Sequence, residues 1–335
     1  MQNRRTMIGL GIGAGLALAS AQAAAQTQTK ASAPTGTQPR LRGAAVTMIA
    51  TPNGPGLAVR TPRGVFDVAG FERATHRGLP TTVSEVINQQ GNITDLQALL
   101  ADPSKVPERW LIPEGDVKFA NMLTHPPKII CVGLNYKAHA AEGGAKPPTE
   151  PILFNKFSTA INHHRNTIKV TGEPEKEWDY EAELVAVMGQ GGRNISEAQA
   201  LSTVFGYANG NDFSNRNLQN RSAQWMLGKT TDGSGPFGPW LVTADQVDPN
   251  NLDMKLTVNG EIRQSTNTSK MIFSCAQIVA YCSKYFTLEP GDVIFTGTCE
   301  GVILGMPKDK QVWLKAGDKM AVSITGLGVL ENALV

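Results

Sequence analysis

The sequence carries three carboxylates whose spacing suits a metal ion. Glu181 and Glu183 stand two residues apart at the start of an apolar, valine-rich run that ends at Met188. Such a run predicts a strand, and residues two apart in a strand point to the same face. Neighbouring carboxylates repel each other unless a cation lies between them, and oxygen ligands suit Mg²⁺ or Mn²⁺, with Ca²⁺ as an alternative, rather than Zn²⁺. We therefore expect a metal site formed by Glu181, Glu183 and Asp212; the alternative is an edge strand whose polar face is only solvated.

Short apolar segments alternate with turn residues in most of the chain, which predicts a β-rich α+β fold. Asn259-Gly260 between two such segments is a strong signal for a two-residue hairpin turn. Helices are expected at Ser196–Thr203, where the serine can cap the first turn, and at Met271–Tyr285, where apolar residues recur at helical spacing. The strands predicted in the larger part are Lys128–Val132, Ile168–Val170, Glu181–Met188, Val204–Ala208, Trp240–Val242, Lys255–Val258, Val293–Thr296 and Met320–Thr325.

The start of the chain is predicted to be an export signal. Arg4-Arg5 precede an apolar stretch rich in glycine and alanine, and the small residues Ala21–Ala25 offer cleavage sites, so residues 1–25 are typical of a signal peptide. The two arginines leave the twin-arginine route and the ordinary secretory route equally open. Either route predicts a periplasmic or secreted protein. No membrane partner is expected after cleavage, because no later segment is long and apolar enough to span a bilayer.

Composition divides the rest of the chain into three parts. Residues 26–43 are rich in Thr, Gln, Pro and Ala and hold almost no large apolar side chains, so we expect a disordered tether. Residues 44–125 are predicted to form a small α+β domain, with short strands such as Val46–Ile49 and one or two helices within Thr82–Leu100. Residues 126–335 are predicted to form a larger, strand-dominated domain that carries the three carboxylates.

Charge and cysteine usage exclude several classes of function. The formal net charge of +2 leaves no basic stripe of the kind that binding a phosphate backbone requires, so nucleic acid is not expected as a partner. The four cysteines are scattered, and none forms a Cys-x-x-Cys pair. Their spacing argues against both a disulfide framework and a zinc site made of thiolates.

Several motifs of the larger part resemble successive signatures of the fumarylacetoacetate hydrolase superfamily. They are GLNYKAHAAE from residue 133, DYEAEL from 179, NDFSNRNLQ from 211, GK at 228, NGE at 259 and LEPGDVIFTGT from 288. Because they occur in the family's order over about residues 128–335, chance similarity is a poor explanation. The resemblance implies a mixed β-sandwich roll with few helices, a small N-terminal domain, a catalytic domain at residues 126–335, and a homodimer. One departure is Cys299 after Gly297-Thr298, where the family usually has proline.

The resemblance and the spacing together suggest a catalytic pair. His139 and Glu142 are three residues apart, so on a helical turn they share a face, and Glu142 can orient the imidazole as a general base. Lys229 would place a positive charge where an enolate oxygen develops; a surface lysine in a Gly/Thr/Ser loop is the alternative. His163-His164 is interpreted as a loop feature, because adjacent residues of a strand point to opposite faces.

Candidates for substrate binding follow the third carboxylate. Arg216 and Gln219 come soon after Asp212 and could bind a substrate carboxylate; surface polar residues at a helix start are the alternative. The family motifs add Tyr136 and Thr298 as expected substrate contacts.

The leading hypothesis is hydrolysis of a carbon–carbon bond in an acylpyruvate or another 1,3-diketo acid, as in fumarylacetoacetate or fumarylpyruvate hydrolases. A metal that chelates the two oxygens of such a keto acid favours enolate chemistry. The same site would support oxaloacetate decarboxylation, keto–enol isomerisation or lyase chemistry. A binding protein that captures keto acids without turnover belongs to another class. The pair His139 and Glu142 argues against it, because binding alone needs no base.

Overall fold

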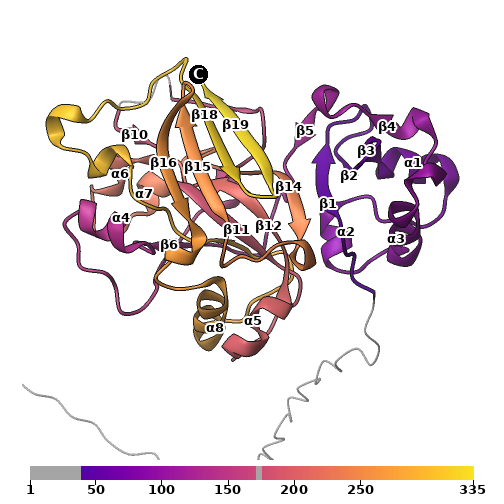
Figure 1. Cartoon of the computed structure of the whole chain (residues 1–335), viewed down its shortest axis with the longest axis horizontal. Helices are drawn as coiled ribbons and strands as arrows, with labels where there is room; N and C mark the ends of the chain where they lie inside the picture. The colour runs from indigo at the N-terminus through magenta and orange to yellow at the C-terminus, as the bar shows by residue number, and fades with distance from the viewer. Residues whose placement is uncertain (1–38, 171–175) are drawn as a thin grey trace, which may run out of the picture. The chain divides into compact units, whose positions relative to one another are not determined.

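A computed structural model describes residues 39–170 and 176–335 of the chain (Figure 1). The predicted signal peptide, residues 1–25, and most of the predicted tether lie outside the described residues. The last residues of the tether are packed: Leu41 is buried, and Arg40 Nη1 donates to Ser202 O at 2.7 Å. Leu41 is a large apolar side chain, so the packed part of the chain begins before residue 44.

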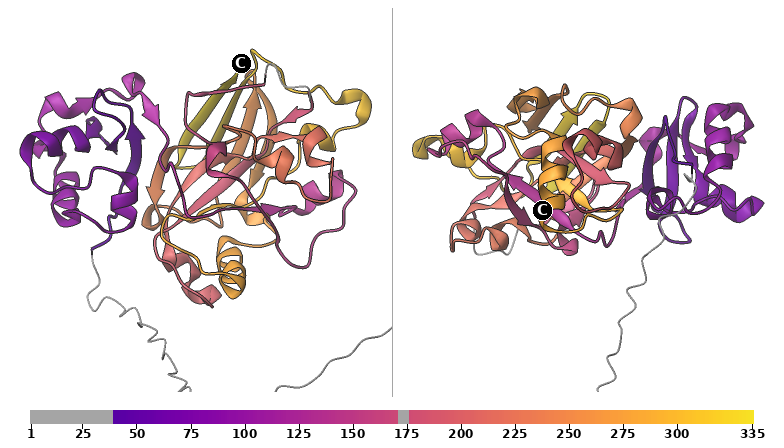
Figure 2. Two further views of the ribbon diagram at one scale, coloured as in Figure 1. Left: turned by 180° about the vertical axis from the view of Figure 1, so that it is seen from behind. Right: turned by 90° about the horizontal axis from the view of Figure 1, so that it is seen from below.

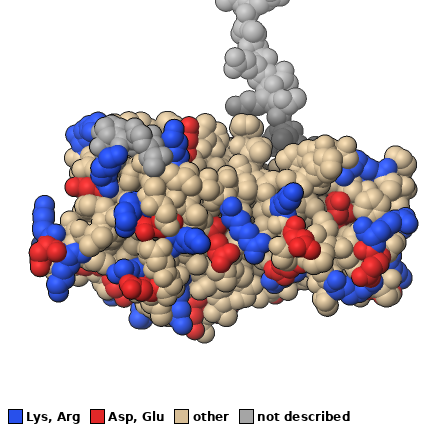
Figure 3. All heavy atoms as spheres, turned by 90° about the horizontal axis from the view of Figure 1, so that it is seen from above, with Lys and Arg blue, Asp and Glu red and all other residues tan. Residues whose placement is uncertain are grey.

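The expected absence of a nucleic-acid or membrane partner stays a prediction. On the face shown in Figure 3, Lys and Arg are interspersed with Asp and Glu. In residues 39–170 and 176–335, no helix is both long and apolar enough to cross a membrane.

The main sheet of the described residues contains twelve strands. Most follow the order β4-β3-β2-β1-β14-β12-β11-β17-β6-β7, while β5 pairs with β1 and β8 with β14. The antiparallel pairing of β1 with β14 makes this sheet continuous across residue 125, and a domain boundary there stays a prediction. The strands are β1 (Ala45–Ile49), β2 (Gly56–Thr61), β3 (Gly64–Asp67), β4 (Leu111–Ile112), β5 (Phe119–Ala120), β6 (Ile129–Gly133), β7 (Ile152–Asn155), β8 (Ile161–Asn162), β11 (Ala182–Met188), β12 (Val204–Asn211), β14 (Gly235–Thr243) and β17 (Val293–Phe295).

A five-stranded sheet in the order β16-β15-β18-β19-β9 and a pair of β10 with β13 complete the β structure of the described residues. Figure 1 shows β16, β15, β18 and β19 side by side. The hairpin predicted at Asn259-Gly260 is confirmed: φ is 52° and 87° at these residues, as a type I′ turn between β15 and β16 requires. These strands are β9 (Thr167–Ile168), β10 (Trp178–Asp179), β13 (Ser214–Asn215), β15 (Asp253–Val258), β16 (Glu261–Asn267), β18 (Lys319–Ile324) and β19 (Gly328–Leu334).

The helices are short and cover the sheets at their margins. Figure 2 shows α1, α2 and α3 gathered around β1 to β4, and α5 lying beside α8. Two helices within Thr82–Leu100 and a helix directly after Ser196 are confirmed. The predicted serine cap is wrong, because the Ser196 hydroxyl donates to Gln199 Oε1 at 2.8 Å instead of accepting a backbone N–H of the first turn. The helices are α1 (Val68–Thr75), α2 (Val83–Ile87), α3 (Ile93–Ala101), α4 (Lys137–Glu142), α5 (Glu197–Thr203), α6 (Arg216–Gln219), α7 (Met226–Lys229) and α8 (Cys275–Tyr285).

The helix predicted at Met271–Tyr285 is confirmed only from Cys275 onward. Ser274 Oγ accepts the Gln277 N–H at 3.3 Å, and Gln277 Oε1 accepts the Ser274 N–H at 3.0 Å. This reciprocal capping box satisfies donors at the helix start. The helix therefore starts after Ser274, whereas apolar periodicity alone placed its start too early, at Met271.

Glycines within β12 and β14 made both strands appear shorter in the sequence than they are in the structure. Both β12 and β14 extend beyond the predicted segments, to Asn211 and from Gly235 respectively, and β7 and β19 have no predicted counterpart. A Cβ on Gly206 would lie 2.3 Å from Val242 O of the neighbouring strand, so close packing requires glycine there. Glycine in a strand thus marks a close approach of two backbones rather than a turn.

The pairing of β11 with β12 positions the predicted metal ligands. β11 is buried along its whole length, which agrees with its continuous apolar run. Ala182 pairs with Asn211, and the Asp212 N–H donates to Glu181 O at 2.9 Å. Residues far apart in the sequence therefore meet at one end of the two strands.

His164 should make the stability of the chain depend on pH. Its ring is buried, stacks edge-on against Phe119, and accepts the Glu331 N–H at 3.0 Å. Burial, followed by the charges of Arg165 and His163, lowers the pKa of His164 from 6.5 to about 4. Between these values the unfolded chain binds a proton that the folded chain does not, so the free energy of unfolding falls as pH falls from about 6.5 to 4.

Urea unfolding across this pH range checks the expectation. His164→Gln should lose less stability between pH 6.5 and pH 4 than the wild type, because glutamine does not titrate. The same loss in both proteins would show that His164 does not contribute.

Candidate metal centre and active site

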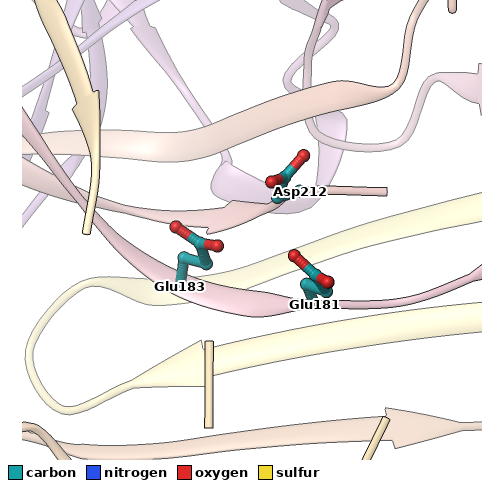
Figure 4. A group of neighbouring side chains, drawn as sticks. All are labelled: Glu181, Glu183 and Asp212. Carbon is teal, nitrogen blue, oxygen red and sulfur yellow. The ribbon is translucent and has the colours of Figure 1, made fainter. Parts of the chain in front are cut away.

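Three buried carboxylates face one another where β11 begins and β12 ends (Figure 4). Glu181 directly precedes β11, Glu183 lies within it, and Asp212 directly follows β12. One oxygen of each lies within 4.8 Å of the others, and the three residues are at most 5 % exposed. The fold therefore brings the predicted ligand set together.

Two buried lysines contact these carboxylates. Lys229 Nζ donates to Glu181 Oε2 at 2.6 Å and to Asp212 Oδ2 at 2.9 Å. Lys156 Nζ lies 2.6 Å from Asp212 Oδ1 and also donates to the backbone oxygens of Lys229 and Ser234. Sequence analysis missed Lys156, because it stands after a strand in no recognisable charge pattern.

The charges around the two glutamates differ. Burial alone would raise the pKa of Glu181, but the positive charges of Lys229 and Arg216 outweigh it and lower this pKa to about 2. Burial, reinforced by the negative charges of Asp212 and Glu181, raises the pKa of Glu183 well above its usual value. Three buried oxygen donors, one of which burial and neighbouring charges keep from ionising, fit a hard divalent cation, because the cation would favour the ionised form of Glu183.

Arg216 is held by carboxylates rather than open to a ligand. Its Nε and Nη2 lie 2.9 Å and 2.8 Å from Asp179 Oδ2, and its Nη1 lies 2.8 Å from Glu181 Oε1. Nη1 also donates to Gln219 Oε1 at 2.7 Å. The guanidinium thus orients Glu181 and Gln219, and its direct binding of a substrate carboxylate stays a prediction.

His139 and Glu142 share one face of α4, at the predicted spacing. His139 Nδ1 lies 2.7 Å from Glu142 Oε1. Since an ionised carboxylate only accepts hydrogen bonds, this contact selects the tautomer of the neutral imidazole in which Nδ1 carries the proton and Nε2 has the lone pair. Glu142 Oε2 accepts the Gly301 N–H at 2.9 Å, and a Cβ on Gly305 would lie 2.4 Å from the Glu142 carboxyl carbon. Both oxygens of the orienting carboxylate are therefore fixed.

The segment 296–305 forms one wall of the site and is fastened to the ligand strand. The Gly297 N–H donates to Glu183 Oε2 at 2.7 Å. At Gly297, φ is 102° and a Cβ would lie 2.6 Å from Asn135 Cβ, so only glycine fits. Farther along, Asp179 accepts the N–H groups of Ile303 and Leu304 at 2.9 Å and 3.0 Å.

A cavity of about 230 Å³ is lined by His139, Glu142 and Lys229 and, among the three carboxylates, by Glu181. Its apolar wall includes Phe154, Trp225, Val302 and Leu304. A larger hollow of about 690 Å³ beside β6 and β7 contains none of the three carboxylates. The polar lining of the smaller cavity comes from His139, Glu142, Glu181, Arg216, Gln219, Asn220, Lys229 and Thr298.

Tyr136, which the family motifs placed near the substrate, does not line this cavity, and neither does Cys299, which stands where the family usually has proline. Tyr136 is 1 % exposed, its hydroxyl has no hydrogen-bond partner among the described residues, and burial raises its pKa. Burial and the charge of Glu300 raise the pKa of Cys299 to about 12, so its thiol stays protonated. Thr298 does line the cavity, and its hydroxyl donates to Ala182 O at 2.9 Å. Thr298 therefore stays a candidate, whereas Tyr136 is a buried core residue here.

Comparison with known proteins agrees with this architecture. The family described as fumarylacetoacetate (FAA) hydrolase C-terminal matches residues 128–335. Oxaloacetate tautomerase Fahd2a, mitochondrial, of Rattus norvegicus is 40 % identical over 274 residues, or 81 % of this chain and 84 % of the rat protein.

Solved structures give the same result. A fumarylacetoacetate hydrolase from Exiguobacterium antarcticum matches with a TM-score of 0.74 and 32 % identity, over 87 % of this chain and 99 % of that chain. Fumarylpyruvate hydrolase from Pseudomonas aeruginosa, in complex with Mn²⁺ and pyruvate, matches with a TM-score of 0.57 and 38 % identity, over 62 % of this chain and 89 % of that chain.

These relatives confirm the predicted β-rich α+β fold and the divalent cation, and they correct the predicted location. The rat protein and a Bos taurus relative are both named as mitochondrial, so the predicted periplasmic or secreted location is wrong. The residues interpreted as a signal peptide lie outside the described part of the chain. The match over residues 128–335 and the 40 % identity to the rat protein show that this chain belongs to the fumarylacetoacetate hydrolase family of enzymes.

Proposed function

We propose that this chain is a divalent-metal-dependent enzyme that transfers a proton on a short, enolisable keto acid, with keto–enol tautomerisation of oxaloacetate as its leading reaction. The observation that carries the proposal is the pair His139 and Glu142, 2.7 Å apart, in the same cavity as Glu181 and Lys229. A base beside a metal centre suits removal of a proton next to a ketone. The name of the rat relative supports oxaloacetate as the substrate. On sequence alone, hydrolysis ranked first and isomerisation was an alternative.

In this proposal His139 is the base. Its Nε2 lone pair takes a proton from the carbon beside the ketone, and the same nitrogen returns the proton to the enolate oxygen or carbon. Glu142 holds the ring through Nδ1 and stabilises the imidazolium that forms in between, because its negative charge lies 2.7 Å away.

Lys229 and Gln219 would bind the oxygens of the substrate. Two of the three N–H groups of Lys229 point to Glu181 and Asp212, which leaves one for an enolate oxygen. The Oε1 atom of Gln219 is engaged by Arg216, so its NH₂ group is the part left to donate. A divalent cation on the three carboxylates would supply Lewis-acid polarisation of the keto acid and a template for its oxygens.

Hydrolysis of an acylpyruvate is the second candidate. The cavity has an apolar wall of Phe154, Trp225, Val302 and Leu304, which would accommodate an acyl group. The fumarylpyruvate hydrolase bound to Mn²⁺ and pyruvate also supports it. Here His139 Nε2 would take a proton from water instead of carbon. Decarboxylation and lyase chemistry stay alternatives, and the homodimer stays a prediction that sedimentation velocity would test.

Replacing the metal ligand Glu183 should weaken metal binding without destabilising the fold. Glu183→Gln keeps the shape but cannot ionise, and ionisation of Glu183 is opposed by burial and by the negative charges of Asp212 and Glu181. We expect Mn²⁺ affinity to fall by more than the roughly 10- to 100-fold that an outer partner costs. The metal-free variant should also melt at a higher temperature than the metal-free wild type, because the repulsion is relieved.

Calorimetric titration with Mn²⁺ and thermal unfolding of chelator-treated protein measure both effects. The exposed Glu261→Gln is the matched control and should change neither. Wild-type Mn²⁺ affinity in Glu183→Gln would remove Glu183 from the metal site.

Replacing the base should reduce turnover and leave the metal in place. His139→Gln is expected to lower kcat for oxaloacetate tautomerisation by about 10²- to 10⁴-fold, the usual contribution of a general base, at unchanged Mn²⁺ affinity. Glu142→Gln should lose less, since it acts through the imidazole. Ultraviolet absorbance of the enol follows the reaction, and acetylpyruvate hydrolysis is measured in parallel.

The exposed His125→Gln is the control and should retain full activity. Full activity of His139→Gln would refute its role as the base. A wild-type protein that hydrolyses acetylpyruvate but does not accelerate oxaloacetate tautomerisation would replace the first candidate by the second. A protein that binds keto acids and turns over neither would be a binding protein.

A further inference from the structure

The pairing of β11 with β17 does not extend to the metal ligands Glu181 and Glu183. β11 pairs with β17 only at Val185, Ala186 and Val187. Beyond that point no described strand pairs with β11 on this side, and single residues bond its backbone groups. Leu184 O accepts both the N–H and the hydroxyl of Thr296, at 3.1 Å and 2.8 Å.

Ala182 is held in the same way, between two side chains. Gln264 Oε1 accepts the Ala182 N–H, and Thr298 Oγ1 donates to Ala182 O, both at 2.9 Å. Ala182 is the residue between Glu181 and Glu183. The peptide groups that set the direction of both carboxylates are therefore fixed from outside the strand.

Gln264 joins this strand to the wall of the cavity. Its Nε2 donates to Thr298 Oγ1 and to Cys299 O, both at 2.9 Å. The residue is 1 % exposed, so its amide group is fully committed to these partners. One side chain thus links the ligand strand to the loop that lines the cavity.

A β-bulge directs Gln264 inward. In the pairing of β15 with β16, Leu256 faces Gln264 while Thr257 faces Ile262, which leaves Arg263 without an opposite residue. Such a bulge bends the strand and re-aims the following side chain. The bulge packs tightly, because a Cβ on Gly301 would lie 2.4 Å from Arg263 O.

We propose that Gln264 is a positioning residue of the metal centre, which sets the direction of Glu181 and Glu183 through Ala182 and the place of Thr298 through its hydroxyl. The inference rests on the metal site and not on which reaction the site performs. A side chain that orients metal ligands indirectly contributes to metal affinity, because without it the ligands spend less time in the binding arrangement.

Metal affinity of the full chain tests the proposal. Gln264→Met keeps a long side chain and removes the hydrogen bonds of the amide to Ala182, Thr298 and Cys299. The Mn²⁺ dissociation constant of chelator-treated protein, measured by calorimetry, should rise about 10- to 100-fold. Thr266→Val is the matched control: Thr266 is buried two residues along the same strand, and its hydroxyl has no hydrogen-bond partner in the described residues. Its dissociation constant should stay within about twofold of the wild type.

A second variant guards against misfolding. Gln264→Asn keeps the amide but is one methylene shorter. Its amide can therefore bond either Ala182 of the ligand strand or the loop at Thr298 and Cys299, but not both, and Mn²⁺ binding should weaken by about tenfold or more. A lower melting temperature with unchanged Mn²⁺ affinity in either variant would mean that Gln264 is only structural and would overturn the proposal. A wild-type chain that binds no Mn²⁺ would overturn the metal centre itself, and the two failures are therefore distinguishable.

Discussion

Repulsion among buried carboxylates is the constraint on which the site depends. Glu181, Glu183 and Asp212 lie within 4.8 Å of one another by one oxygen each, and Asp179 lies just behind them. Three buried cations oppose these four carboxylates, so full ionisation of the carboxylates would leave one negative charge unbalanced. The raised pKa of Glu183 places this imbalance at Glu183, whose neutral, protonated form is favoured in the absence of a cation. The buried cations of the site are Lys156, Lys229 and Arg216.

A divalent cation reverses this balance. The cation would favour the ionised form of Glu183, and four carboxylates, three side-chain cations and the divalent ion then sum to one net positive charge, which attracts an anionic keto acid to the cavity. The lysines are therefore not substitutes for the metal. They keep a dense group of carboxylates folded, which would otherwise be costly to bury.

The distant parts of the chain are tied to this cluster by single polar side chains. Asp179 fastens the wall at Ile303 and Leu304, while Glu142 fastens it at Gly301 and orients His139. The base and the metal centre thus share one wall. A change in that wall is expected to affect both proton transfer and metal binding.

Local periodicity was enough to predict part of this site. A period of two placed Glu181 and Glu183 on one face, and a spacing of three paired His139 with Glu142, because both relations lie within a single element. Asn259-Gly260 also predicted its hairpin from local turn chemistry. These are features whose geometry depends on neighbours in sequence.

Long-range contacts were beyond such reasoning. Lys156 reaches Asp212 and Gln264 reaches Ala182 only because separate strands are brought together by packing. Arg216 was predicted to face a substrate, and nothing near it in sequence shows that two carboxylates hold it. Which groups a charged side chain contacts depends on residues that are distant in the sequence, and the spacing of residues along the chain does not reveal them.

The location of a bound ion tests the central claim most directly. Crystals of the chelator-treated chain soaked in Mn²⁺ would reveal the ion by its anomalous scattering. The account predicts one Mn²⁺ per chain in contact with Glu181, Glu183 and Asp212. An ion bound elsewhere, or Glu181 and Asp212 that remain bridged by Lys229 with no Mn²⁺ bound, would contradict it.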